Sequence, residues 1–282
     1  MSPVLLMGLP DSGKTNFLAR TWIALTEKGC AVKPHGTPKD IAYVESLVQH
    51  LLQGRFAPRS NQNEEPRPFT LEVTDPLSGK VMPLMVPDVR GELWKGAVLN
   101  SELPEEWMDR LHSCNAVLLL LRVHSPDIVK PLDWVASKRS MEHQPDDPGD
   151  ANDTPTQVML CELLRLLEVA LARKGGVPPR VAVLVTAWDL LSSEEQADGP
   201  ERYIQQQFPM LAGRLRDITK LEIAVFGVSI LGGDLAEDEQ FQEEFLASNS
   251  IQDRGFVVHQ ANGELQNFHD LTSPLAWCIR AK

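Results

Sequence analysis

The segment from Gly8 to Thr15 constrains the fold more than any other part of the sequence. It reads GLPDSGKT, which matches the pattern GxxxxGK[ST], and it lies between an apolar run at 3–7 and a stretch with helical spacing at 15–28. An apolar run that stops at a glycine is typical of a buried parallel strand entering a tight loop. This phosphate-binding motif requires strand, loop and helix in that order. The sequence therefore predicts an α/β chain whose first loop holds phosphates.

The positions of this loop have physical reasons. Only glycine tolerates the backbone turn at both ends, and N–H groups of the loop and of the next helix point at phosphate oxygens. Lys14 is expected to reach the β- and γ-phosphates, and Thr15 to give a hydroxyl to Mg²⁺. The alternative is a glycine-rich turn without ligand. The expected nucleotide contacts are Gly8, Asp11, Ser12, Gly13, Lys14, Thr15 and Asn16.

Strand-like and helix-like segments alternate along the rest of the chain. Strand-like segments at 69–74 and 81–86 are too close for a crossover helix, so they should form an antiparallel hairpin. Further strands are expected at 116–123, 181–186 and 223–229, and helices near 39–53, 104–112, 156–174 and 201–215. The pattern predicts one domain, residues 1–282, with a doubly wound α/β fold. Its sheet should be mostly parallel with one antiparallel edge hairpin, and helices should cover both faces.

Two segments depart from this alternation. Residues 124–155 form an insertion whose second half is acidic and rich in proline, which predicts a disordered loop or a partner-binding one. Residues 255–282 contain an Asn262-Gly263 turn between two short strand candidates, and then Thr272, which would cap a last short helix. We expect a C-terminal hairpin and helix there.

Charge and cysteine content limit the partners. The chain has 27 Lys plus Arg against 39 Asp plus Glu, and its formal net charge of −12 disfavours binding to a nucleic-acid backbone. The four cysteines lie far apart without a CxxC pair, so neither a disulfide framework nor a zinc cluster is expected. The longest apolar run, at 116–121, is too short to span a membrane. We therefore expect a cytoplasmic protein that binds neither nucleic acid nor membrane.

A second magnesium contact is expected after the hairpin. Asp88, in the segment VPDVRG at 86–91, is the candidate to hold Mg²⁺ through water. The spacing Asp-x-x-Gly lets the Gly91 amide approach a γ-phosphate, so that this segment would sense the nucleotide state. The Asp-x-x-Gly motif by itself is weak evidence for such a segment. Its place after an antiparallel hairpin separates translation-factor and Ras-like GTPases from P-loop kinases and RecA-like ATPases.

On these features the chain resembles P-loop GTPases of the translation-factor and Ras-like (TRAFAC) class. Within that class, the long helix before the hairpin, the insertion and the ending at 270–277 look like the bacterial double-GTPase domains of predicted conflict (anti-phage) systems. The resemblance implies GTP or GDP with Mg²⁺ as ligands. It also implies a protein partner, which would be a companion GTPase-like subunit or an effector.

The resemblance further implies a base-recognition loop with the pattern Asn-Lys-x-Asp. This chain has Thr186, Ala187, Trp188 and Asp189 there. Asp189 can accept hydrogen bonds from the N1–H and 2-amino groups of guanine, which adenine does not offer. Thr186 replaces the Asn that would tie this loop to the phosphate loop, and Ala187 removes the Lys stem that lies over the base. We therefore expect a weakened guanine preference; the alternative is that Asp189 caps a helix starting at Leu190.

The remaining expected positions are those of the switches and the last base loop. Ser60 is the expected switch I ligand of Mg²⁺, and Thr37 is the alternative, although Thr37 could equally cap a helix. Glu92 stands where the water-positioning residue is expected, and its charge opposes the γ-phosphate unless Arg90 or a partner's arginine lies close. A backbone N–H near Ser229 would meet the guanine carbonyl.

Together these features predict a GTP-binding molecular switch with slow, Mg²⁺-dependent hydrolysis, which acts through a protein partner. The catalytic candidates are Glu92, Lys14 and Gly91. The resemblance adds a role in anti-phage defence. The alternative is a structural subunit that binds GTP or GDP without hydrolysing it. An ATPase or kinase is disfavoured by the hairpin and by Asp189.

Overall fold

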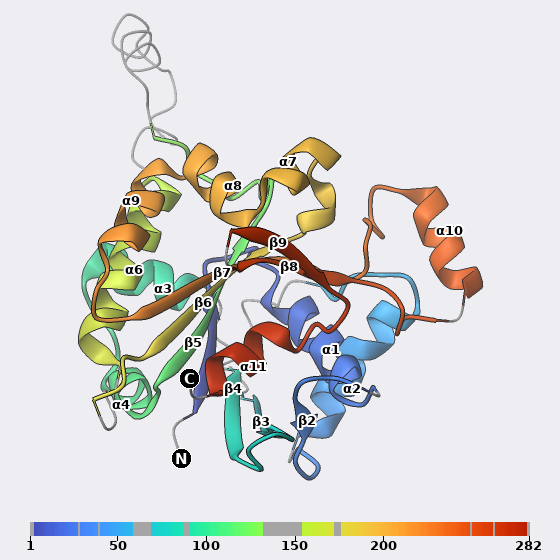
Figure 1. The fold of residues 1–282 in the computed structure, drawn as a ribbon, viewed down its shortest axis with the longest axis horizontal. Helices are drawn as coiled ribbons and strands as arrows, with labels where there is room; N and C mark the ends of the chain where they lie inside the picture. Colours follow the sequence, from blue (N-terminus) through green and yellow to red (C-terminus); the bar gives the residue numbers. More distant parts are fainter. Residues whose placement is uncertain are drawn as a thin grey trace, which may run out of the picture.

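A nine-stranded sheet forms the framework of the described residues (Figure 1). The computed structural model describes residues 3–27, 29–38, 40–58, 69–86, 91–131, 154–171, 176–248, 250–261 and 263–280, with the backbone only at 86, 91 and 92. The strand order is β2-β3-β4-β1-β5-β6-β7-β8-β9. The strands are β1 (Val4–Gly8), β2 (Lys33–Pro34), β3 (Phe69–Thr74), β4 (Val81–Val86), β5 (Ala116–Arg122), β6 (Arg180–Thr186), β7 (Glu222–Ser229), β8 (Phe256–Ala261) and β9 (Glu264–Phe268).

The centre of the sheet is parallel and its two edges are antiparallel. Strands β4, β1, β5, β6 and β7 run side by side in one direction. β3 pairs antiparallel with β4, as the short gap between them predicts. At the other edge β8 pairs antiparallel with both β7 and β9. We predicted one antiparallel edge; the second arises because Val257 and Val258 of β8 are buried, which joins the C-terminal hairpin to the sheet.

Helices cover both faces of the sheet because each central strand buries both of its faces. On β5, Leu118 and Leu120 belong to one hydrophobic core, and Val117 and Leu119 to the other. The first core packs against α1 (Lys14–Leu25), α2 (Ile41–Leu52) and α11 (Ser273–Ile279) (Figure 1). The second packs against α3 (Gly91–Asn100), α4 (Glu105–Ser113), α6 (Thr156–Ala170), α8 (Pro200–Gln207) and α9 (Pro209–Asp217).

Three details of the helices differ from the sequence-based expectations. The segment 201–215 is divided between α8 and α9, because Pro209 cannot donate to the hydrogen-bond ladder of a continuous helix. The N-cap position of α2 is Asp40, so Thr37 does not cap this helix. Thr272 occupies the N-cap position of α11, but its hydroxyl donates to Asp270 Oδ1 instead of capping.

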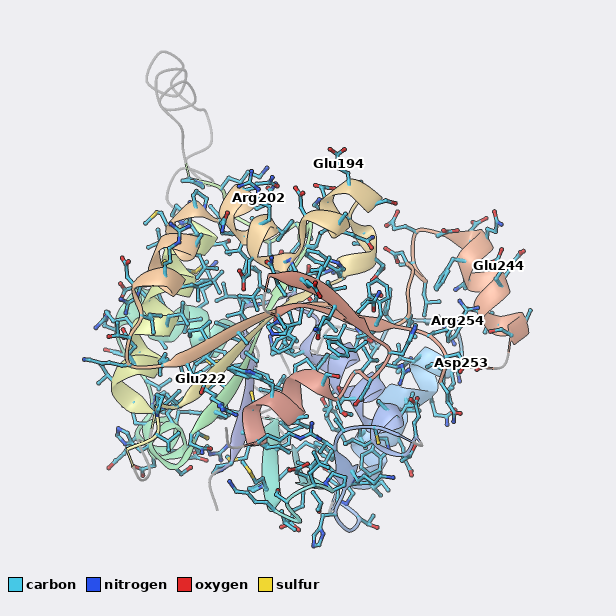
Figure 2. All side chains as sticks on the ribbon, viewed as in Figure 1. Glu194, Arg202, Glu222, Glu244, Asp253 and Arg254 are labelled. Atoms are coloured by element: carbon cyan, nitrogen blue, oxygen red, sulfur yellow. The ribbon has the colours of Figure 1, made fainter. Side chains whose placement is uncertain are left out.

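The helix α10 (Glu239–Ser248) lies to one side of the molecule (Figure 1), and its Phe245 is buried in the first core. Arg254 holds it from the segment before β8, with its guanidinium 5.2 Å from the ring centre of Phe241. Figure 2 shows Arg254 near Glu244 of this helix. Gln242 Nε2 also donates to the carbonyl of Gly54, at 2.7 Å. α10 thereby supports the segment that follows α2.

The two segments that depart from the alternation are described to different extents. Of the insertion at 124–155, residues 132–153 lie outside the described residues. Residues 256–280 contain β8, β9 and α11. Among the described helices, none combines the length and the apolar composition that crossing a membrane would need.

Candidate functional site

The phosphate loop joins β1 to α1 and depends on its glycines. A Cβ at Gly8 would lie 2.5 Å from Ser12 Oγ and 2.8 Å from the carbonyl oxygen of Leu120, so only glycine fits there. Gly13 has a φ of 84° and takes the N-cap position of α1. The first turn of α1 carries no acidic residue. The loop and the helix start are therefore a cradle whose shape and polarity suit an anion.

The side chain of Lys14 is folded across this loop. Its Nζ donates to the carbonyl oxygens of Gly8 at 2.9 Å and Leu9 at 2.8 Å, and to Ser12 Oγ at 3.0 Å. Thr15 follows in the first turn of α1. The ammonium group thus lies at the loop itself, where it can meet phosphate oxygens.

The base loop is tied to the phosphate loop by Thr186. This residue ends β6 and is 4% exposed, and its Oγ1 donates to the carbonyl oxygen of Ser12 at 2.9 Å. In the pattern Asn-Lys-x-Asp, this tie is the role of the Asn that Thr186 replaces. The hydroxyl of Thr186 makes it instead, so the two loops remain joined.

Asp189 lies in a single turn of 3-10 helix, Trp188–Leu190. The interpretation as a helix cap is wrong, because the next helix, α7 (Ser193–Asp198), is capped by Ser192. The Asp189 carboxylate instead accepts a hydrogen bond from the Ser229 hydroxyl. Ser229 Oγ in turn accepts from the backbone N–H of Gly232 at 2.8 Å. Ser229 therefore holds Asp189 with its side chain.

Trp188 anchors the base loop in the hydrophobic core. Its side chain is fully buried and lies edge-on to Tyr203, with 5.9 Å between ring centroids. A Cβ at Gly227 of β7 would lie 2.6 Å from the Trp188 ring, so β7 needs glycine there. Ala187, just before it, has a φ of 56°, which is uncommon for a residue other than glycine. Such strain is typical of functional loops.

One cavity of about 190 Å³ lies between the phosphate loop and the base loop. The segment after α2 and the loop after β7 contribute the other walls. Its polar and charged lining residues are Asp11, Asn16, Arg122, Thr186, Asp189 and Asp234. The structure thus brings residues predicted for phosphate and for base together at the carboxyl end of the parallel strands, where α/β folds bind ligands.

The electrostatics of the cavity centre on Asp189. Partial burial raises the pKa of this carboxyl above its usual range, and the negative charge of Asp234 acts in the same direction. The hydrogen bond from Ser229 and the positive charge of Arg122 oppose the rise. Asp189 is therefore a carboxylate whose charge depends on its neighbours.

Arg122 is the site residue that the sequence analysis missed. It ends β5, and its Nη1 lies 3.1 Å from both carboxylate oxygens of Asp11. Ser125 Oγ also donates to Asp11 Oδ2, at 2.7 Å. Asp11 and Arg122 also line a second cavity, of about 470 Å³, together with Leu9, Pro10 and Ser12 of the phosphate loop. The signal in the sequence was a lone arginine directly after the apolar run at 116–121, and the sequence analysis gave it no role.

Asn16 connects α1 to the segment that follows α2. Its Oδ1 accepts a hydrogen bond from the backbone N–H of Ala57 at 2.8 Å. Phe56 and Ala57 line the cavity, a few residues before Ser60 in the chain. Thr37 is exposed and precedes α2, at the other end of that helix. The segment leading to Ser60, rather than that around Thr37, reaches the cavity.

The remaining predicted residues lie at the border of the described part or beyond it. Ser60, Asp88 and Arg90 lie outside the described residues, and Gly91 and Glu92 open α3 with only their backbone described. The next turn of α3 is anchored by Trp94, which is fully buried and lies 5.8 Å from Trp107 between ring centroids. Within the described part of the chain, no three His, Cys, Asp or Glu side chains gather as a metal site.

Comparison with solved structures gives distant likenesses. A chain of the signal recognition particle receptor SRb-GTP/SRX complex from Chaetomium thermophilum is 14% identical, with a TM-score of 0.37 over 88% of this chain and 97% of that one. The GTP-bound Ski7 GTPase-like domain of S. cerevisiae is 12% identical, with a TM-score of 0.40 over 88% of this chain and 50% of that one. No curated protein matches in sequence.

Comparison with family models gives a match over nearly the whole chain. The model that matches is Double-GTPase 1, and it spans residues 5–278. Those residues include the phosphate loop, the hairpin of β3 and β4, the base loop and all but the last residue of α11. The protein is therefore a P-loop GTPase that belongs to the Double-GTPase 1 family.

Proposed function

We propose that the protein is a molecular switch that binds Mg²⁺·GTP between its phosphate loop and its base loop and hydrolyses it slowly. The observation that carries the proposal is the hydrogen bond from Thr186 to Ser12, which joins the two loops around one cavity. A nucleotide has a charged end and a flat polar end, so a site for it needs two different loops at a fixed distance. The tie provides that fixed distance.

The phosphate end of the proposed site uses backbone groups and two side chains. Loop N–H groups and Lys14 would hold the β- and γ-phosphates, and Thr15 would hold Mg²⁺ with Ser60 and Asp88. Mg²⁺, when bound, neutralises charge on the phosphate oxygens. The absence of acidic residues from the first turn of α1 suits this role, because a carboxylate there would repel the phosphates.

The base end of the proposed site uses Asp189 as the guanine reader. Its carboxylate would accept hydrogen bonds from the N1–H and 2-amino groups, while the Ser229 hydroxyl keeps its orientation. The backbone N–H near Ser229 would meet the guanine carbonyl. Adenine has neither an N1–H nor a 2-amino group, so it would leave the carboxylate without a hydrogen-bond donor.

Hydrolysis is assigned to the start of α3. The Gly91 amide would contact the γ-phosphate and Glu92 would orient the attacking water, with Lys14 stabilising the charge that develops. Two like charges oppose each other there, since both Glu92 and the γ-phosphate are negative. We therefore expect slow hydrolysis by the isolated protein and faster hydrolysis with a partner that brings an arginine.

The wider role is part of the same proposal. The partner would be a companion GTPase-like subunit or an effector, and the insertion at 124–155 is a candidate surface for it. The setting would be bacterial anti-phage defence in the cytoplasm. We also propose that residues 1–282 form one domain with doubly wound connectivity.

A second candidate function is a structural subunit that binds GTP or GDP without hydrolysing it. The feature that favours it is Glu92 itself, because a carboxylate next to the γ-phosphate repels this phosphate and so disfavours hydrolysis. In that case nucleotide would only stabilise the fold and the binding surfaces.

The test is to identify the nucleotide in purified protein and then to follow single-turnover GTP hydrolysis. Wild type, Glu92→Ala and the control Glu102→Ala, an exposed residue before α4, are compared alone and with any co-purifying partner. The switch proposal expects guanine nucleotide, slow turnover in wild type and the control, and an altered rate in Glu92→Ala. Zero turnover throughout would favour the structural subunit, and bound adenine nucleotide would contradict both.

A further inference from the structure

The base loop lacks a cation, and a neighbouring strand brings one to the same cavity. Position 187 is alanine, so the loop has no long charged stem to lie along the cavity. Arg122 ends β5, and in the parallel pairing of β5 with β6 it stands directly beside Thr186. Val123, the next residue, donates its backbone N–H to the Thr186 carbonyl at 3.0 Å. The end of β5 is thus fixed to the start of the base loop.

We propose that Arg122 is the specificity-determining cation of this site: it links Asp11 of the phosphate loop to the base loop and supports the guanine-reading charge of Asp189. The inference rests on the proposed function and assigns a residue to it. Arg122 takes the place of the stem that Ala187 lacks, but it enters from another strand.

The charges around the cavity support this assignment. Three carboxylates line it, those of Asp11, Asp189 and Asp234. Among the described residues that line it, Arg122 is the only cation. The negative charges of three carboxylates oppose the approach of a polyanionic nucleotide. The guanidinium offsets part of that repulsion from a position between the two loops.

The geometry of Arg122 lets it hold Asp11 while part of its side chain stays accessible from the solvent. Its Nη1 lies 3.1 Å from both oxygens of Asp11, which is 10% exposed, while its own side chain is 32% exposed. Asp11 has a φ of 56°, in the left-handed region, where aspartate is more common than most residues other than glycine. The ion pair with Arg122 and the hydrogen bond from Ser125 fix the direction of its carboxylate.

The pH dependence of GTP binding should report the same arrangement. Asp189 is faced by Arg122 from β5, by Asp234 from the loop after β7 and by the hydroxyl of Ser229, and Asp11 lines the same cavity. The positive charge of Arg122 lowers the pKa of Asp189, so removing Arg122 should raise that pKa further. GTP affinity should then begin to fall at a higher pH on acidification, because only the ionised carboxylate accepts both guanine donors.

The experiment measures binding of GTP, inosine triphosphate and ATP to the full chain by calorimetry. Arg122→Gln removes the charge, whereas Arg122→Lys keeps it and can still reach Asp11, since one nitrogen makes both contacts. The matched control is Arg280→Gln, which breaks a similar arginine–carboxylate pair, with Asp75 at 3.2 Å, away from the cavity. If the glutamine variant does not fold, Arg122→Met, with a stem of similar length, replaces it.

For Arg122→Gln we expect GTP affinity to fall about tenfold, the scale of a lost charge-assisted contact, with a smaller fall for inosine triphosphate, which lacks the 2-amino group. Arg122→Lys and Arg280→Gln should stay within about threefold of wild type. An unchanged GTP affinity in Arg122→Gln, or an equal fall for all three nucleotides, would overturn the inference. Failure of the proposed function would look different: wild type would not bind GTP, or Lys14→Ala would bind it as wild type does.

Discussion

The two ends of the cavity differ in how they are built. At the phosphate end, the groups that face the ligand are largely backbone atoms, and the residues are those that such a backbone requires: Gly8, Gly13 and Lys14. At the base end, the groups are side chains that come from three strands and their loops. Thr186 ends β6, Ser229 ends β7 and Arg122 ends β5.

This difference explains why one end follows its sequence pattern and the other does not. A backbone cradle fails if a glycine gains a Cβ, because the contact at Gly8 would be 2.5 Å. A side-chain contact can be made by another residue type, as the hydroxyl of Thr186 does in place of an amide, or from another strand, as we infer for Arg122. We therefore expect changes at the phosphate end to abolish binding and changes at the base end to alter selectivity.

The largest effect should come from Lys14→Ala. This change removes the ammonium group that lies across the phosphate loop, and we expect Mg²⁺·GTP affinity to fall by about 100-fold or more. ATP and GTP should lose affinity equally, since both share the triphosphate. The control is Lys80→Ala, an exposed lysine in the turn before β4, which should bind GTP as wild type does. Binding that persists in Lys14→Ala would contradict the assignment of the phosphate end.

The next effect should come from Asp189→Asn at the base end. The amide cannot accept two hydrogen bonds from guanine, but it can donate to the 2-oxo group of xanthine. We expect GTP affinity to fall by about 10- to 100-fold and xanthosine triphosphate to bind more tightly than to wild type. Competition against a fluorescent nucleotide measures both. Asp198→Asn, an exposed position in α7, is the control. A uniform loss for every nucleotide would mean that Asp189 does not read the base.

A smaller effect should come from Thr186→Val, which breaks the tie between the two ends. The shapes are alike, but the hydrogen bond to Ser12 is lost, and we expect GTP and inosine triphosphate affinities to fall together by about three- to tenfold. Thr21→Val is a matched control, because Thr21 on α1 is also buried and its hydroxyl has no hydrogen-bond partner among the described residues. A fall for GTP alone would show that Thr186 acts on the base and not on the distance between the loops.

The sequence predicts those parts of the fold that depend on local patterns, and it does not predict those that depend on contacts between distant segments. The parallel strands, the hairpin of β3 and β4 and the loop at Gly8 follow from local patterns, namely apolar runs, a short gap and paired glycines. The antiparallel edge at β8 does not, because a short hairpin with an Asn-Gly turn looks the same whether it stands alone or joins a sheet. What decides it is the burial of Val257 and Val258, which depends on the neighbouring strand β7.

The site shows this limit more sharply. Asp189 could be found because it follows a buried strand at the expected place, but Ser229 and Arg122, which stabilise its charge, are 40 and 67 residues away. Register between parallel strands places Arg122 beside Thr186, and no local pattern reports register between strands separated by a long insertion. The switch residues Ser60, Asp88 and Glu92 stay predictions, because their side chains lie outside the described residues.

The smallest predicted effect concerns stability without nucleotide and has the opposite sign from binding. Burial raises the pKa of Asp189 above its unfolded-state value, so the folded chain holds this proton more tightly than the unfolded chain. The resulting stability is lost as pH rises through the folded-state pKa, and at neutral pH the ionised group costs free energy. Asp189→Asn should therefore raise the unfolding temperature at pH 7 by about 2 °C, and the difference should shrink as the pH falls toward the unfolded-state pKa. Thermal unfolding of both proteins between pH 5 and pH 8 measures this. A variant that is less stable than wild type at pH 7 would show that the hydrogen bond from Ser229 outweighs the burial of the charge.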